Sequence, residues 1–393
     1  MLNQRLMVTR DLAALCRVPD GQTRECRMYD QEAFRNSFTP KNVVDSCELY
    51  FVCWSPHCPI LHLSTFDVAK VHPPLLLAVF LIGLAYSSEL EASLARAYYD
   101  LAEDYAFNHP DFRTLLQNDL PSWRPPFTSL EPLQAAYLMV LVQMCTNNTV
   151  SRRRVRSSRY NDVIRAARGL KLFDSKNEYL DLEPREWVEF DWHGFVAKES
   201  RIRVAYLIFG IESNFAMFHA HYPRLAISEM TGDPMCRESC FSATTSAACE
   251  QHTKQEMRAN ALSLSACLHC TIHASRASGT GRILYPAMTR ALDRWIRIWK
   301  SQISIFPLEE WKKIGFMQDA GPEFWQLAYM FVEAEIRGLL NTELLRSMDE
   351  DKMENVCHLL ETFCRASWDE ARRPGHRGYR DPTTRHLLDS NEF

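Results

Sequence analysis

The chain has 393 residues, of which 46% are hydrophobic and 24% are charged, so it can bury the core of one large domain or two ordinary ones. Its formal net charge of -4 excludes the broad basic surface that nucleic-acid binding by phosphate neutralisation favours. Thirteen cysteines without regular spacing, and no signal peptide, predict reduced thiols in the cytosol or nucleus, and no uninterrupted apolar run reaches the roughly 18 residues of a membrane span.

Residues 1–40 are mixed and polar, with a turn at residues 19–21, and they predict a lead-in rather than a domain. The aromatic-rich segment 49–54 then leads into a turn that contains Pro56 and Pro59. Because proline fixes φ and has no backbone N–H, we expect a helix to end there.

Pro73 and Pro74 open an uncharged run that continues to Ala85. Proline is favoured in the first turn of a helix, because its missing N–H would have no helical partner there. A helix that is apolar on every side is buried. We therefore predict that residues 75–85 form the central helix of the core.

Two further helices are predicted after the core helix. Apolar and charged residues recur at helical spacing over residues 90–105, which predicts an amphipathic helix. Residues 133–144 are nearly all apolar and follow an N-cap candidate, Ser129, with Pro132 in the first turn. This pattern predicts a second buried helix.

A run of arginines follows this helix at Arg152, Arg153, Arg154 and Arg156. A dense arginine cluster can serve as a nuclear-import signal or contact nucleic acid. Charge blocks more commonly serve solubility, so we favour a solvated loop and the polar face of the next helix. Nuclear import through this run is the alternative hypothesis.

Residues 184–222 predict a long helix with one apolar stripe. Glu199 and Arg203 lie one turn apart on a flank of that stripe. Unpaired charges beside a buried stripe are costly, so we expect these two to pair with each other or with neighbours. A catalytic glutamate would also need a pocket and partner groups, which the sequence does not supply.

Small and polar residues fill positions 231–255 and predict a surface loop. Helical patterns return at residues 286–300, 322–345 and 353–368. The arginine-rich tail, residues 372–393, has no apolar face and is predicted to be mobile. The fold class is therefore all-α, a large multi-helix bundle or array.

These motifs resemble the fungal-specific transcription factor domain, the middle homology region that lies downstream of zinc-cluster or zinc-finger DNA-binding modules. The proline turn and core helix match at Tyr50, Phe51, Pro56, Pro59, Ile60, Leu61, His62, Thr65, Phe66, Pro73, Pro74, Leu75, Leu76, Leu77, Ala78, Gly83, Tyr86 and Ser87. The later motifs match at Leu133, Gln134, Ala135, Ala167, Arg168, Gly169, Leu170, Trp187, Trp192, Glu199, Ser200, Arg203, Phe209, Pro223, Ser228 and Glu229. The clear resemblance covers residues 42–230 and fades beyond them.

The resemblance implies a single regulatory domain over residues 41–371, without catalytic residues, that regulates transcription of a restricted gene set in the nucleus, such as a secondary-metabolite cluster. It implies no cofactor in this chain, because the family's zinc belongs to an upstream DNA-binding module whose cysteine spacing this sequence lacks. The expected partners are the transcription machinery or a DNA-binding protein. A small-molecule effector and a homodimer are further expectations, and this chain alone is expected to bind DNA weakly at most and no membrane.

Other functional classes stay open on the sequence. A co-regulator or scaffold would differ only in lacking DNA contact. An α-helical enzyme, such as an isoprenoid cyclase, would hold magnesium on acidic motifs, which Asp100, Glu103 and Asp104 and residues 349–351 faintly match. The C-x-x-C at residues 267–270 resembles a zinc knuckle, although its apolar spacing favours a buried helix.

Overall fold

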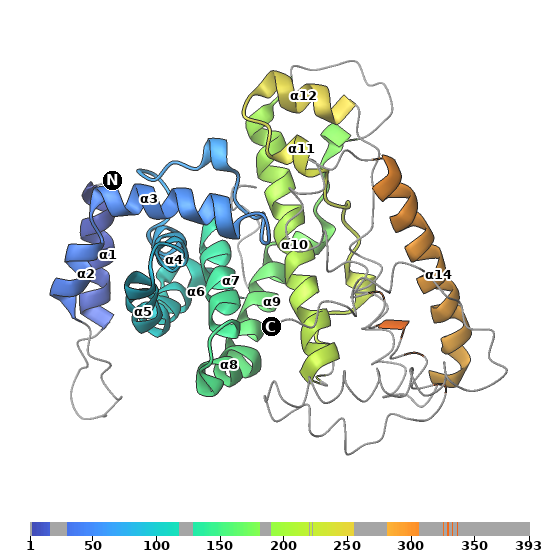
Figure 1. The fold of residues 1–393 in the computed structure, drawn as a ribbon, viewed down its shortest axis with the longest axis horizontal. Coiled ribbons are helices and arrows are strands. Elements are labelled where there is room, and N and C mark those ends of the chain that lie inside the picture. The colour runs from blue at the N-terminus through green and yellow to red at the C-terminus, as the bar shows by residue number, and fades with distance from the viewer. Residues whose placement is uncertain are drawn as a thin grey trace, which may run out of the picture.

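A computed structural model describes the chain in several stretches. These are residues 2–15, 30–117, 129–180, 190–219, 221, 223–254 and 281–305, with the single positions 325, 328, 329, 332 and 336. Every regular element in these residues is a helix, which confirms the predicted all-α fold class (Figure 1).

The helical elements follow one another along the chain. In order they are α1 (Leu2–Leu15), α2 (Gln31–Ser37), α3 (Pro40–Leu49), η1 (Tyr50–Trp54), η2 (Leu63–Thr65), α4 (Pro73–Leu84), α5 (Glu89–Asn108), α6 (Pro110–Leu115), α7 (Glu131–Met144), α8 (Thr149–Arg154), η3 (Val155–Arg159), α9 (Tyr160–Gly169), η4 (Leu172–Asp174), η5 (Glu178–Leu180), α10 (Trp192–His219), η6 (Ile227–Glu229), α11 (Glu238–Phe241), α12 (Ser246–Lys254) and α14 (Gly281–Ile305). Both η1 and η3 are π-helical turns.

Helix α4 is the centre of the core, as the sequence predicted. Pro73 and Pro74 occupy its first turn, and every residue from Pro73 to Leu84 is buried. Helices α1, α3, α5 and α7 pack against it, so it meets protein on all sides (Figure 1). The predicted limits, residues 75–85, differ from the observed ones by one or two residues at each end.

Gly83 allows α3 to cross α4 at very short range. A Cβ atom at this position would lie 1.8 Å from the carbonyl oxygen of Ser46, on the backbone of α3. Real Cβ atoms do not approach backbone this closely, so the crossing requires a residue without a side chain. This contact gives a steric reason for the family-motif glycine.

The first forty residues contribute to the core, although the sequence predicted only a polar lead-in. Val8 and Leu12 of α1, one turn apart, are buried together with Phe34 of α2 and Phe38. The Phe38 ring lies 4.7 Å from the ring of Phe80 in α4. A few apolar residues at helical spacing thus attach a mostly polar segment to the main core.

The long helix α10 joins the main core to a smaller one. Its C-terminal half contributes Phe209 to the main core, and its N-terminal half contributes Phe195 to a cluster formed with α11 and α12. The surface loop predicted at residues 231–255 is therefore wrong in large part. Phe241 and Cys249 of that segment are buried, because small side chains let short helices pack closely on α10.

Helix α14 confirms the helix predicted at residues 286–300. It lies at the edge of the molecule, beyond α10 in the view of Figure 1. The helices predicted at residues 322–345 and 353–368, the tail at residues 372–393 and the C-x-x-C at residues 267–270 lie mostly or wholly outside the described residues. The described helices include none that is long and apolar enough to cross a bilayer.

Candidate functional site

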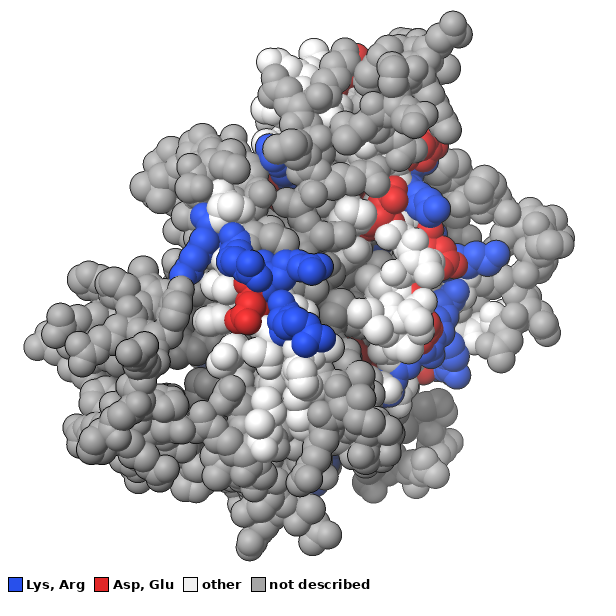
Figure 2. Space-filling view, turned by 90° about the vertical axis from the view of Figure 1, so that its right-hand side faces the viewer, with Lys and Arg blue, Asp and Glu red and all other residues white. Residues whose placement is uncertain are grey.

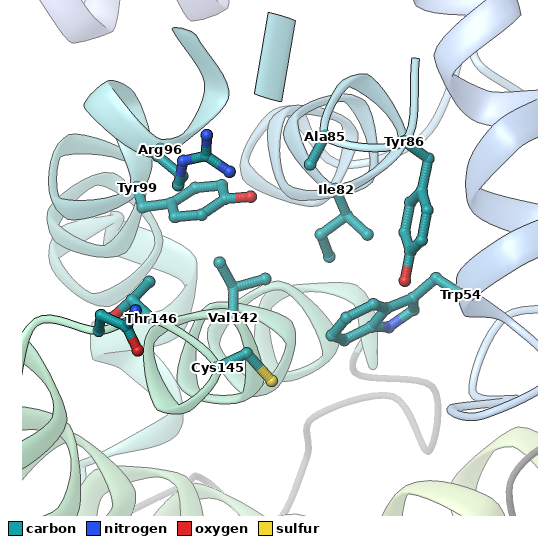
Figure 3. A pocket seen from close by; sticks show the side chains of 10 residues that line it. Trp54, Ile82, Ala85, Tyr86, Arg96, Tyr99, Val142, Cys145 and Thr146 are labelled. Atoms are coloured by element: carbon teal, nitrogen blue, oxygen red, sulfur yellow. The ribbon is translucent and has the colours of Figure 1, made fainter. Parts of the chain in front are cut away.

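A pocket of about 500 Å³ opens where α4 and α7 end beside α5 (Figure 3). Its walls are apolar and aromatic: Trp54 of η1, Tyr86 after α4, Tyr99 of α5, Ile82 and Val142. In Figure 3 the Trp54 and Tyr86 rings stand on one side and Tyr99 on the other. This volume falls within the range of about 300–1,000 Å³ that small-molecule sites occupy.

The polar groups of the pocket are neutral near pH 7, apart from one cation at its edge. Burial raises the pKa of Tyr99 to about 12, and it also raises the pKa of Tyr86 and of the Cys145 thiol. Arg96 is the cation, and its Nη2 lies 2.8 Å from Oε1 of Glu89. The pocket therefore presents hydroxyl and thiol donors between apolar walls.

This arrangement suits the binding of a small molecule. The described residues that line the pocket include no carboxylate and no imidazole. A flat, mostly apolar molecule with hydrogen-bond acceptors would fit both the walls and the donors.

A second feature is the Arg203 cluster, which we define as Glu199, Arg203, Cys236 and Glu238. Arg203 Nε lies 3.1 Å from Glu199 Oε1, and its Nη1 lies 2.7 Å from Glu238 Oε2. Arg203 Nη2 donates to the carbonyl of Cys236 at 3.1 Å, and the N–H of Cys236 donates to Glu199 at 2.9 Å. The cluster fastens the α11 segment to α10.

Both members of the central pair are buried, with Glu199 at 0% and Arg203 at 2% exposure. Burial raises the pKa of Glu199, while Arg203 and the N–H of Cys236 act against this rise. Burial alone would lower the pKa of Arg203, but Glu238, Cys236 and Glu199 outweigh it and raise that pKa. The predicted pairing of Glu199 with Arg203 is confirmed, and its role here is structural.

Phe241 connects this cluster to the proline turn. The guanidinium carbon of Arg203 lies 4.0 Å from the centre of the Phe241 ring, and the His62 ring lies 5.3 Å from it. His62 Nε2 donates to the carbonyl of Ala243 at 3.3 Å, and its Nδ1 lies 3.0 Å from Thr65 Oγ1. Family-motif residues far apart in sequence thus meet on one aromatic ring.

The other family-motif residues shape the core around this contact. Pro59 is half-buried between Cys58 and Ile60, which are both buried. Phe66 packs against the Phe51 ring at 5.4 Å. Together with Pro73, Pro74 and Gly83 of α4, these are packing residues that do not line the pocket, whereas Tyr86, another residue of the motif, does.

The arginine run is helical, whereas the sequence predicted a solvated loop and the polar face of the next helix. It covers the end of α8 and the π-helical turn η3. Arg153 is exposed, Arg152 and Arg154 are half-buried, and Arg156 is only 3% exposed. Nuclear import through the exposed part of this run, at Arg153, stays a hypothesis.

Carboxylates on α5 bind part of this run. Arg154 Nη2 lies 2.6 Å from Glu103 Oε2 and 2.7 Å from Asp100 Oδ1, and Arg159 Nε lies 2.8 Å from Glu103 Oε1. Arg159 also pairs with Asp104. On the face drawn in Figure 2, described Lys and Arg side chains likewise lie beside Asp and Glu side chains.

These pairs give the acidic group Asp100, Glu103 and Asp104 a structural role. A magnesium-binding motif of an isoprenoid cyclase would point its carboxylates into a substrate cavity. Here Glu103 is fully buried, and its oxygens accept hydrogen bonds from Arg154, Arg159 and the amide of Gln143. The resemblance to a cyclase motif is therefore not supported at this position.

Glu238 and Cys236 were not predicted as partners of Arg203. Their segment reads as small and polar, and Glu238 lies 35 residues beyond Arg203. The one available signal was the Arg203 side chain itself, which has more donors than Glu199 alone can satisfy. The pocket was not predicted either, because its wall comes from four separate elements.

Comparisons with known proteins identify the family. The fungal specific transcription factor domain matches residues 47–306. The chain belongs to that family. The match extends past residue 230, where the motifs recognised in the sequence had faded, and so includes the α11 and α12 segment that packs on α10.

Individual relatives are more distant. Transcription factor verF of Penicillium polonicum is 25% identical over 360 residues, which cover 77% of this chain and 48% of that protein. Zinc finger proteins zas1 and klf1 of Schizosaccharomyces pombe are each 23% identical, over 54% and 49% of this chain and 23% and 24% of their own lengths. The chain thus spans at most about half the length of these relatives. No solved structure matches it.

Proposed function

We propose that this chain is the regulatory part of a transcription regulator that acts in the nucleus. The observation that carries the proposal is the family match over residues 47–306. Relatives named as a transcription factor and as zinc finger proteins support it. DNA is then read by a separate module or by a partner protein, because the described arginines are largely engaged within the fold.

The pocket beside α4 supports a more specific role, in which a small molecule controls the regulator. The walls of the pocket come from α4, α5, α7 and η1, so its shape depends on how these elements are spaced. A ligand that prefers one spacing shifts the domain toward that conformation by its difference in affinity for the two states. The ligand class is a flat, mostly apolar molecule that carries hydrogen-bond acceptors.

The end of α7 offers a route from the pocket to the rest of the domain. Cys145 lines the pocket directly after α7, and Gln143 of α7 donates to Asp100 and Glu103 on α5. The same carboxylates bind Arg154, at the end of α8. A shift at the pocket therefore reaches α8 and η3 through contiguous hydrogen bonds and ion pairs.

The proposed targets are a restricted gene set, such as a neighbouring secondary-metabolite cluster. Deleting the gene in its host tests this proposal, with transcripts measured across the genome. We expect a small set of transcripts to change together and to recover when the wild-type gene is returned. Unchanged transcripts with accumulation of one pathway intermediate would mean an enzyme and would contradict the proposal.

A further inference from the structure

Three side chains with metal-binding donors converge at the N-terminus of α4. His72 directly precedes Pro73, and His109 and Asp111 lie where α5 ends and α6 begins. One donor atom from each residue lies within 4.8 Å of the other two. His72 Nε2 lies 3.0 Å from Asp111 Oδ2, and His109 Nδ1 lies 3.6 Å from the same oxygen.

The two imidazole rings are packed edge to face, with their centres 4.4 Å apart. Burial lowers the pKa of His72 to about 4, and it also lowers the pKa of His109. Both rings are therefore neutral near pH 7, and each keeps one nitrogen lone pair. That of His109 Nδ1 accepts the backbone N–H of Asp111 at 3.3 Å, so a metal at this nitrogen would replace that hydrogen bond. Neutral imidazole is the form that binds transition metals.

His72 has a further property that points to a ligand. Its side chain is 9% exposed, and its second ring nitrogen, Nδ1, is buried without a hydrogen-bond partner among the described residues. A metal-binding histidine commonly pairs one nitrogen with a carboxylate and binds the metal with the other. His72 therefore has one ring nitrogen beside Asp111 and a second that is buried without a partner among the described residues.

The charges around the two rings favour a cation. Among the described residues, the groups recorded beside the Asp111 carboxylate are the rings of His72 and His109, which are neutral near pH 7 and leave its negative charge in place. Glu131 of α7 accepts the backbone N–H of His72 at 2.7 Å. Asp11 of α1, whose carboxylate accepts from Tyr105, adds a further negative charge near His109, although Arg10 pairs with it.

We propose that His72, His109 and Asp111 bind one zinc ion, with water completing a tetrahedral set of ligands. Two imidazole nitrogens and one carboxylate are a ligand set that zinc takes in proteins, whereas magnesium and calcium prefer oxygen ligands alone. Zinc–ligand bonds of about 2.0–2.2 Å place the ligand atoms of a tetrahedron about 3.3–3.6 Å apart. The two imidazole nitrogens already lie 3.0 and 3.6 Å from Asp111 Oδ2, and Asp111 can adjust further because its side chain is 61% exposed.

The ion would connect the start of the core helix α4 to the α5–α6 corner. A metal that binds only the folded chain stabilises it, because unfolding then also requires release of the metal. Zinc should therefore raise the melting temperature of the whole domain. The site is independent of the pocket and of the proposed regulatory function.

Zinc binding by the purified 393-residue chain tests the proposal. The protein is stripped of metal with a chelator, kept reduced and titrated with zinc against a competing fluorescent indicator. Asp111→Asn is the main variant, because asparagine keeps an oxygen acceptor beside His72 and the position is exposed. His57→Gln is the control, since His57 is an exposed histidine outside the three-residue group.

We expect the wild type and His57→Gln to bind one more zinc ion than Asp111→Asn, or to bind that ion at least about tenfold more tightly. Loss of a group that merely supports a metal ligand already costs about 10–100-fold. Zinc should raise the melting temperature of the first two proteins and leave that of Asp111→Asn unchanged. Cobalt, as a spectroscopic probe, should show nitrogen and oxygen ligation that the variant lacks.

Equal zinc stoichiometry, affinity and thermal shift in all three proteins would overturn the proposal. That result would mean that any bound zinc is held by cysteine thiolates elsewhere in the chain. His109→Gln provides a second variant, and circular dichroism checks that each protein is folded. A zinc response that survives in both folded variants contradicts the proposal equally.

Discussion

The guanidinium of Arg203 in α10 lies on the face of the Phe241 ring in α11, 4.0 Å from its centre, and both side chains are buried. Phe241 also contacts His62 of the proline turn. This stacking places a buried cation at the junction of the two hydrophobic clusters. The stability of the region therefore depends on the carboxylates that surround Arg203.

Arg203→Met should destabilise the chain by about 3–5 kcal/mol. Methionine approximates the length of the side chain but leaves Glu199 buried without its cation, which is the costly way to break a buried pair. Urea unfolding measures the loss. Arg165→Met is the control, because its pair with Asp162 is on the surface and should contribute less than about 1 kcal/mol. Equal losses in the two variants would show that the Arg203 cluster is not important for stability.

Gly83→Ala should destabilise the chain by about 1–3 kcal/mol or more, because the added methyl group would overlap the Ser46 carbonyl and push α3 away from α4. Gly210→Ala is a matched control on α10, where a Cβ meets no atom within 4 Å. Alanine there should stabilise the helix by about 0.5–1 kcal/mol. Thermal or urea unfolding should show that Gly83→Ala lowers stability and that Gly210→Ala raises it. A change of the same sign in both variants would contradict the close crossing of α3 and α4.

His62 should make stability fall as the pH is lowered through 6.5. Burial lowers the pKa of His62, with nearby Arg203 and His193 acting in the same direction and Glu238 and the Ala243 carbonyl acting against it. The unfolded chain takes up a proton near pH 6.5, whereas the folded chain resists it. The stability that neutral His62 contributes to the folded chain is present above pH 6.5 and is lost as the pH falls toward the folded-state pKa.

Urea midpoints measured near pH 7 and near pH 5 test this dependence, since the ring titrates in that range. His62→Gln retains hydrogen-bonding groups but does not titrate. Its midpoint should fall less on acidification than that of the wild type. The same pH dependence in both proteins would show that His62 is not the titrating group.

The sequence predicted those features whose signals are local. The uncharged run after Pro73 predicted α4, and the one-turn spacing of Glu199 and Arg203 predicted their pair. Glu238 could not be predicted, because its partner lies 35 residues away on another helix. The pairing of Arg154 with Glu103 is also long-range, across 51 residues. Neither contact has a local sequence pattern, because each depends on how helices pack.

The same reasoning applies to the pocket and to the N-terminal helices. The pocket depends on where α4 and α7 end relative to Tyr99, which no single segment encodes. Val8 and Leu12 are too few to give residues 1–40 an apolar face in a sequence scan, yet both are almost fully buried. Sparse apolar residues become informative only when the surface that they cover is known.

This chain alone should bind duplex DNA weakly, without sequence preference, and with strong salt dependence. In the run at residues 152–156, Arg156 is buried and Arg154 is paired with α5, so few arginines of that run are available for phosphate contacts. Fluorescence anisotropy with short labelled duplexes at low and physiological salt measures this binding. Saturable, sequence-selective binding at physiological salt would show that this chain reads DNA itself.

The central claim is that occupancy of the pocket beside α4 controls transcription, and blocking the pocket tests it most directly. Cys145→Trp should fill the pocket from its edge, whereas Leu90→Trp places the same side chain on the exposed face of α5. Transcripts that change on gene deletion are measured in strains that carry each variant at equal protein abundance. We expect Cys145→Trp to fix these transcripts at one level across growth conditions while Leu90→Trp behaves as wild type. Wild-type regulation in the Cys145→Trp strain would contradict the claim.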